Sequence, residues 1–220
     1  MNQPPDPDSM LVFSYLELRR AIGVLGIALP FVVALGGSIV FGSGIQDSIS
    51  GYYYTGMRNV LVGTLCSIGV FLLSYKGYER VDAIAGTCAC VFAVGVALFP
   101  TVPVVDPTSR QEVIGHVHLA FASLFFATLA FFSLSLFTRT DPEKPPTGRK
   151  LQRNRVYRTC GFVMVACLIA IIIVHVILSM NPHDALGAWN PVFWLESVAI
   201  VAFGVSWITK GEALLKDDVR

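Results

Sequence analysis

The sequence contains little charge. Asp, Glu, Lys and Arg make up 14% of its 220 residues, while 54% of the residues are hydrophobic. The mean hydropathy of +0.65 lies well above that of an ordinary soluble domain. No nucleic-acid-binding motif and no convincing internal repeat is visible, so nucleic acid is not expected as a partner. The composition therefore indicates a protein that is embedded in a membrane.

The common catalytic motifs are also missing. The sequence has no HExxH motif and no pair of histidines at helical i, i+4 spacing, which are the usual marks of a zinc hydrolase. It has no GxSxG motif for a serine hydrolase elbow. All five cysteines lie within or at the edges of apolar segments, and no pair is placed like a loop disulfide. Any chemistry must therefore come from residues that are far apart in the sequence.

Six apolar segments are long enough to cross a bilayer, whose hydrocarbon core of about 30 Å needs roughly 20 residues per helix. Backbone in lipid must satisfy its own hydrogen bonds, so each segment is predicted to be a helix. The predicted fold is an all-α polytopic membrane protein, a six-transmembrane-helix bundle, with residues 21–209 as one membrane domain. The predicted spans are residues 21–41, 59–75, 83–99, 114–137, 161–179 and 192–208.

The flanking and connecting segments predict the orientation. Residues 1–20 are predicted to form a disordered tail and an interfacial lead-in, and residues 210–220 a cytoplasmic tail. Lys and Arg gather before the first span, between the second and third, in residues 138–160 and in the tail, whereas the other loops hold only Arg58 and Arg110. Both termini are therefore predicted to be cytoplasmic, in the inner or plasma membrane of the cell.

One carboxylate, Glu196, lies in the otherwise apolar or small stretch PVFWLESVAIVAFG. His118 and His175 lie at about the same depth in two other spans, near their outer ends. A charge in lipid costs from about 3 kcal/mol upward, so such groups usually face the bundle interior and pair with one another. We therefore predict a polar pocket at the outer ends of the spans, with Arg58 or a protonated histidine as the partner of Glu196.

The loop QDSISGYYYTGMRN lies on the same predicted side and adds further polar groups. Asp47 and Arg58 from this loop could instead simply pair with each other. The predicted pocket or binding residues are Glu196, His118, His175, Arg58, Asn59, Ser50 and Tyr53. The catalytic candidates are Glu196, His118 and Asp47.

Three short motifs carry a resemblance to a known family. They are SIS…MRN after the first span, HLAFASLFFATLAFFSL in the fourth and FWLE at the start of the sixth. The chain resembles a group of six-span bacterial membrane domains of unknown function and, more distantly, the damage-regulated autophagy modulator, Sfk and GPI-lipid-remodelling proteins. The resemblance implies that Asp47, Ser50, Arg58, His118 and Glu196 matter. It implies no activity, because most members have none assigned.

Several functions are left open by the sequence. The favoured one is lipid binding or lipid remodelling, with a membrane lipid as the partner. The alternatives are an accessory or structural subunit, in a homo-oligomer or a larger membrane complex, and a proton-coupled transporter or channel. Few ionisable groups occur in the inner halves of the spans, which counts against transport.

Catalysis is left undecided, and no cofactor is assigned. The sharpest chemical hypothesis is a metal-assisted lipid hydrolase, in which a zinc ion held by His118, His175 and Glu196 activates water. Asp47 would then act as the base, and Arg58 would steady negative charge. The motif spacing gives no direct support to such a site.

Overall fold

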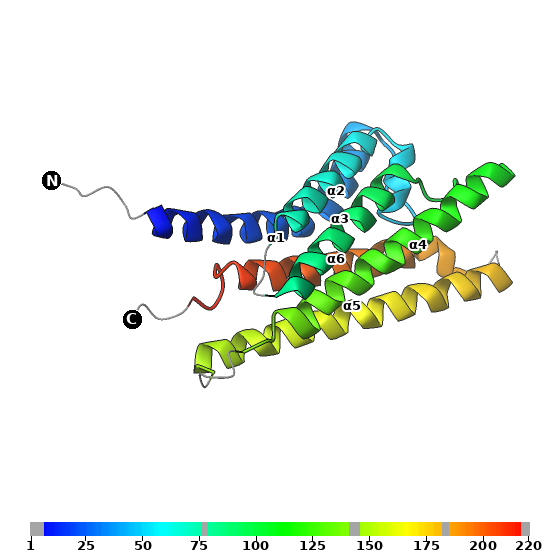
Figure 1. Ribbon diagram of the computed structural model, residues 1–220. Coiled ribbons are helices and arrows are strands. Elements are labelled where there is room, and N and C mark those ends of the chain that lie inside the picture. The colour runs from blue at the N-terminus through cyan, green and yellow to red at the C-terminus, as the bar shows by residue number, and fades with distance from the viewer. Residues whose placement is uncertain (1–6, 76–78, 141–145, 182–184, 217–220) are drawn as a thin grey trace.

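A computed structural model describes residues 7–75, 79–140, 146–181 and 185–216, and every regular element in these ranges is helical (Figure 1). The all-α prediction is confirmed. Two 3-10 helices, η1 (Ser50–Tyr54) and η3 (Ala185–Trp189), lie in connecting segments, and a π-helical turn, η2 (Phe132–Leu136), extends α4. The α-helices are α1 (Pro7–Val40), α2 (Arg58–Leu73), α3 (Arg80–Leu98), α4 (Ser109–Phe131), α5 (Gly148–Met180) and α6 (Pro191–Lys210).

Among the described residues, five helices are long and apolar enough to cross a membrane, which corrects the prediction of six. The exception is α2. Its 16 residues give a length of about 24 Å at 1.5 Å per residue, whereas the hydrocarbon core of a bilayer is about 30 Å thick. The predicted span 59–75 was too long because it included Ser74 and Tyr75, which lie beyond the end of the helix.

Two further boundaries differ from the prediction. Helix α1 begins at Pro7, so residues 7–20 continue the first spanning helix, and residues 1–6 of the predicted tail lie outside the described residues. Helix α5 begins at Gly148, 13 residues before the predicted span 161–179, and the Thr147 hydroxyl accepts a hydrogen bond from the Lys150 amide there at 3.1 Å. The segment is rich in Arg, Lys, Gln and Leu, which are good helix formers, so the helix extends beyond its apolar part.

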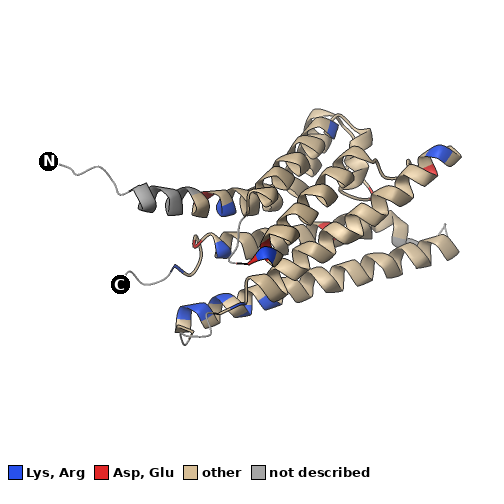
Figure 2. Ribbon diagram, viewed as in Figure 1, with Lys and Arg blue, Asp and Glu red and all other residues tan. Residues whose placement is uncertain are grey.

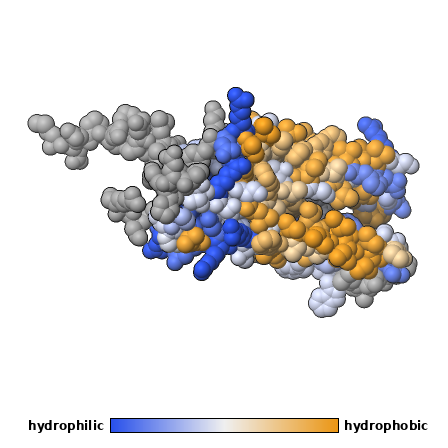
Figure 3. Space-filling view, turned by 60° about the horizontal axis from the view of Figure 1, so that its bottom comes forward, coloured by the Kyte–Doolittle hydropathy of each residue, from blue (hydrophilic) through white to orange (hydrophobic). Residues whose placement is uncertain are grey.

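The helices run back and forth between two chemically different ends (Figures 1 and 2). At the first, Arg19 and Arg20 of α1 donate hydrogen bonds to the carbonyl oxygens of Lys210 and Gly211, at 3.4 and 2.8 Å. Most Lys and Arg residues lie at this end, which we call the basic end. The opposite end, the loop end, consists of residues 41–57, residues 99–108 and η3. An apolar surface covers the helices between them (Figure 3).

Small residues allow the helices to approach closely. On α3 the stripe formed by Ala85, Ala89, Ala93 and Ala97 is buried, and the Cβ of Ala93 lies where a side chain at Gly69 of α2 would touch it. Helices α1 and α6 cross at Gly23 and Gly204. A Cβ added at either glycine would lie within 2.7 Å of the carbonyl oxygen of the other, so these backbones are in direct contact.

Aromatic side chains fill the bundle near the basic end. The indole of Trp207 is fully buried, and its ring centroid lies 5.1 to 5.5 Å from those of Tyr75, Phe132 and Phe137 in edge-to-face arrangements. Nearby, the buried hydroxyls of Ser133 and Ser206 share a hydrogen bond of 2.8 Å. These side chains pack closely against one another in the interior near the basic end.

Candidate functional site

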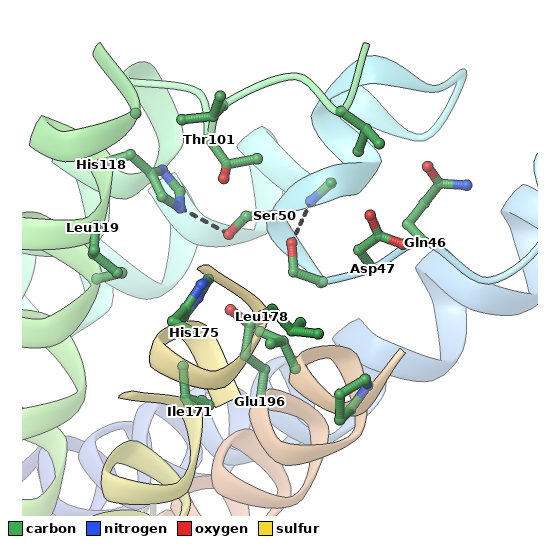
Figure 4. A pocket seen from close by; sticks show the side chains of 18 of the residues that line it. Gln46, Asp47, Ser50, Thr101, His118, Leu119, Ile171, His175, Leu178 and Glu196 are labelled. Carbon is green, nitrogen blue, oxygen red and sulfur yellow. Dashed lines mark hydrogen bonds between the residues drawn. The ribbon is translucent and has the colours of Figure 1, made fainter. Parts of the chain in front are cut away.

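A cavity of about 1040 Å³ lies at the loop end, between α4, α5, α6 and the loops above them (Figure 4). One part of its wall is apolar and comes from α4 and α5. The other part is polar and comes from residues 46–51 and from single residues on the helices. The apolar residues include Leu119, Ala122, Phe126, Leu168, Ile171, Ile172 and Val176, and the polar residues include Asp47, Ser48, Ser50, His118, His175 and Glu196.

The cavity reaches the surface of the bundle between α4 and α5. Leu119 on α4 and Ile172 on α5 both line it, yet their side chains are 45% and 54% exposed. Both are exposed apolar residues of helices that are long and apolar enough to cross a membrane. The opening is therefore framed by side chains of the kind that face acyl chains in a bilayer.

The start of α6 holds the 41–57 loop in place over the cavity. The Asn190 side-chain amide donates to the Ile45 carbonyl at 3.2 Å, and the Phe193 amide donates to the Asp47 carbonyl at 2.9 Å. Asn190 adopts a left-handed conformation, φ 48°, which Asn tolerates better than most residues, and Pro191 then begins α6 with the φ that a helix requires. The loop is thus attached to a rigid helix end.

Glu196 makes the third attachment, one turn further along α6. Its Oε2 accepts a hydrogen bond of 2.7 Å from the amide of Ile49, a residue that is only 3% exposed. The predicted partners, Arg58 and a protonated histidine, are replaced by this backbone N–H. Ile49 immediately precedes η1, so the carboxylate fixes the point at which Ser50 enters the cavity.

The buried residue Tyr52 completes the attachment of this loop. Its hydroxyl donates to the Gly44 carbonyl at 3.1 Å, and its ring packs against Phe193 with centroids 6.2 Å apart. Burial raises the pKa of this phenol above its ordinary value of 10.0, because the charged form would lose its hydration. Tyr52 therefore contributes to the rigidity of the loop in its neutral form.

Ser50 and His118 meet across the cavity wall (Figure 4). The His118 Nε2 lies 3.0 Å from the Ser50 Oγ, and its Nδ1 lies 2.6 Å from the carbonyl oxygen of Phe99, at the end of α3. The carbonyl can only accept, so Nδ1 carries a proton. With the side chain only 6% exposed, a neutral ring is the less costly form, and Nε2 then accepts the Ser50 hydroxyl proton.

His175 extends from α5 into the same space, below Ser50 in the close-up view (Figure 4). In the described part of the chain, its imidazole has no hydrogen-bond partner. Asp47 lines the cavity at its exposed rim, and its backbone rather than its carboxylate holds the loop. Ser50, His118, His175 and Glu196, which were assigned to one pocket from the sequence, all line this cavity.

The other predicted pocket residues lie elsewhere. The guanidinium of Arg58 donates a hydrogen bond to the Tyr53 hydroxyl and stacks on its ring, with Cζ 4.1 Å from the centroid. Arg58, Asn59 and Tyr53 are not among the residues that line the cavity. Arg58 is exposed at the start of α2 and is occupied by Tyr53, so it does not neutralise Glu196.

The geometry gives no support to the predicted zinc site. Within the described ranges, no group of three His, Cys, Asp or Glu side chains is arranged to hold a metal ion. Both ring nitrogens of His118 already have partners, and Glu196 Oε2 accepts the Ile49 amide. The residues present at this site fit a hydrogen-bonded framework better than a set of metal ligands.

Sequence reasoning missed the segment between α3 and α4. Val102, Pro103, Val104 and Val105 line the cavity, and Tyr54 donates to the Thr101 carbonyl at 2.6 Å. Gly115 of α4 is the one residue in the sequence that could have indicated this contact. A Cβ at this position would lie 2.1 Å from the Val102 side chain, so only glycine allows the segment to pack against the helix.

Comparison with family models, with curated proteins and with solved structures gives no match to this chain. The resemblance to the six-span family therefore stays a prediction, and the function must be argued from the geometry of the cavity.

Proposed function

We propose that this protein binds a membrane lipid in the cavity at its loop end. The observation that carries the proposal is the division of the cavity wall into an apolar part and a polar part. An amphiphile fits such a wall, with its acyl chain along α4 and α5 and its polar part against Ser50, His118 and His175. The volume of about 1040 Å³ is at the upper end of the range of about 300–1,000 Å³ that is usual for small-molecule sites.

The position of the opening supports a ligand that arrives from the bilayer. Leu119 and Ile172 frame the opening on the apolar surface. A lipid can therefore enter sideways without leaving the hydrocarbon region, and its polar part meets the polar groups at the end of the bundle. A water-soluble ligand would not reach an opening on the lipid-facing surface.

We further infer that the basic end lies in the cytoplasm. Lys and Arg are concentrated there, and the positive-inside rule places such ends on the cytoplasmic side of the cell membrane. Helix α1 begins and helix α6 ends at this end, so the cavity faces the outer side.

Transport of protons is less well supported than binding. A relay needs polar groups across the whole membrane. Between the cavity and the basic end the interior is packed with Trp207, Tyr75 and Phe132. The cavity therefore resembles a pocket with one blind end more than a path through the membrane.

The test is native mass spectrometry of the protein released from detergent micelles. Ala122 on α4 lines the cavity, whereas Ala120 on the same helix is exposed and does not line it. Ala122→Trp should abolish the lipid-bound species because the indole fills the apolar part, and Ala120→Trp should retain it. Equal lipid retention in the two variants, or none in the unaltered protein, would contradict the proposal.

A further inference from the structure

In the Ser50–His118 hydrogen bond the serine hydroxyl donates and the imidazole accepts, which is the direction that a serine nucleophile requires. Because the Phe99 carbonyl fixes the proton on Nδ1, the free lone pair of the neutral imidazole is on Nε2 and faces Ser50 Oγ. A base that accepts the nucleophile's proton and is oriented by a third group is the arrangement that activates serine. We propose that Ser50 and His118 cleave an acyl ester, and this rests on the proposed binding of lipid in the cavity.

The reaction conserves atoms and charge in two halves. Ser50 Oγ bonds to the ester carbonyl carbon while its proton passes to His118 Nε2. The bond to the lipid alcohol then breaks, and the imidazolium returns the proton to the leaving oxygen, which gives an acyl-serine and a free alcohol. Water attacks the acyl-serine and gives one proton to Nε2, and the fatty acid leaves as Ser50 regains that proton.

The third group of the site indicates the class of substrate. In protease triads a carboxylate stabilises the imidazolium, whereas here the partner of Nδ1 is the backbone carbonyl of Phe99, which carries no full charge. The base is correspondingly weaker. Esters are more easily cleaved than amides, so an acyl ester of a membrane lipid is the substrate that this pair suits.

The surroundings place such an ester within reach of Ser50. The serine lies between the apolar wall of α4 and α5, where an acyl chain fits, and the open loop end, where water can enter. The His175 imidazole, which no described residue engages, faces this space and can donate a hydrogen bond to the carbonyl oxygen as negative charge develops on it. Glu196 acts as a positioning residue, because it holds the Ile49 amide next to Ser50.

The experiment uses a fluorophosphonate with a long alkyl chain, which reacts covalently with activated serines, on the whole protein in detergent. Ser197 provides a matched control because it is not among the residues that line the cavity, and its hydroxyl donates to the Phe193 carbonyl of its own helix. Peptide mapping should place the label on Ser50. Ser197→Ala should react like the unaltered protein, Ser50→Ala should not react, and His118→Gln should react about 10²–10⁴-fold more slowly.

Turnover is measured with vesicles of phosphatidylethanolamine and phosphatidylglycerol that carry a labelled acyl chain. Fatty acid should be released by the unaltered protein and by Ser197→Ala, and release should be lost in Ser50→Ala, whose thermal unfolding shows whether it is folded. A folded protein that retains lipid in mass spectrometry but leaves Ser50 unlabelled overturns the nucleophile while the binding proposal stands. Labelled Ser50 without retained lipid supports the nucleophile and overturns the lipid substrate.

Discussion

Removal of the Glu196 carboxylate should loosen the loop that forms the cavity roof. In Glu196→Ala the buried amide of Ile49 loses its acceptor at 2.7 Å, and water cannot easily replace it because Ile49 is 3% exposed. An orphaned buried donor costs about 1–3 kcal/mol. In Glu196→Gln the side-chain carbonyl still accepts the bond, so we expect roughly half of that loss.

The free energy of unfolding is followed by thermal denaturation in detergent, together with hydrogen exchange of the Ile49 amide. For a chain of this size each kcal/mol corresponds to roughly 2–4 °C, so Glu196→Ala should unfold about 2–12 °C lower. Ser197→Ala is the matched control, because the Ser197 hydroxyl bonds only to its own helix, at the Phe193 carbonyl. The reasoning is refuted if Glu196→Ala and Ser197→Ala have the same unfolding temperature and the Ile49 amide exchanges no faster in Glu196→Ala than in the unaltered protein.

Three further predictions concern the framework around the site. Gly204→Val should separate α1 from α6, because even a Cβ at this position would lie 2.6 Å from the Gly23 carbonyl oxygen. Its unfolding temperature in the same assay should be at least as low as that of Glu196→Ala. Gly63→Ala is the control and should not lower the unfolding temperature, because a Cβ at Gly63 meets no other atom. Trp207→Ala should cost about 3–5 kcal/mol, seen in chemical denaturation, because it empties the aromatic cluster. Stability should fall as the pH rises beyond 10, since the folded state holds the Tyr52 proton more tightly than the unfolded state, and Tyr52→Phe should reduce this fall in a pH series of melting curves.

The membrane character and the helices followed directly from the sequence. Long apolar runs specify helices in lipid, because the backbone has no other way to satisfy its hydrogen bonds. Helix ends were less predictable, because hydropathy marks where the lipid ends and the helix itself can continue. Helix α5 shows this, since it begins at Gly148 although the apolar run begins at residue 161.

The sequence allowed the titratable residues of the candidate site to be predicted, but not the groups to which they bond. His118, His175 and Glu196 were identified because an ionisable group in an apolar span is expensive and so has a reason to be there. Glu196 bonds to the Ile49 amide and His118 bonds to the Phe99 carbonyl, and such backbone groups occur in almost every residue and therefore leave no mark in the sequence. Arg58 was assigned to Glu196 by charge alone, whereas the neighbouring Tyr53 ring offers it a closer contact.

The most direct test of the central claim is an experimental structure of the protein in a lipid nanodisc. We predict elongated density along the α4 and α5 wall that enters between Leu119 and Ile172 and ends within hydrogen-bonding distance of Ser50 or His175. A cavity closed by collapse of α4 onto α5, or one that holds only water while lipid stays outside the bundle, would contradict the account.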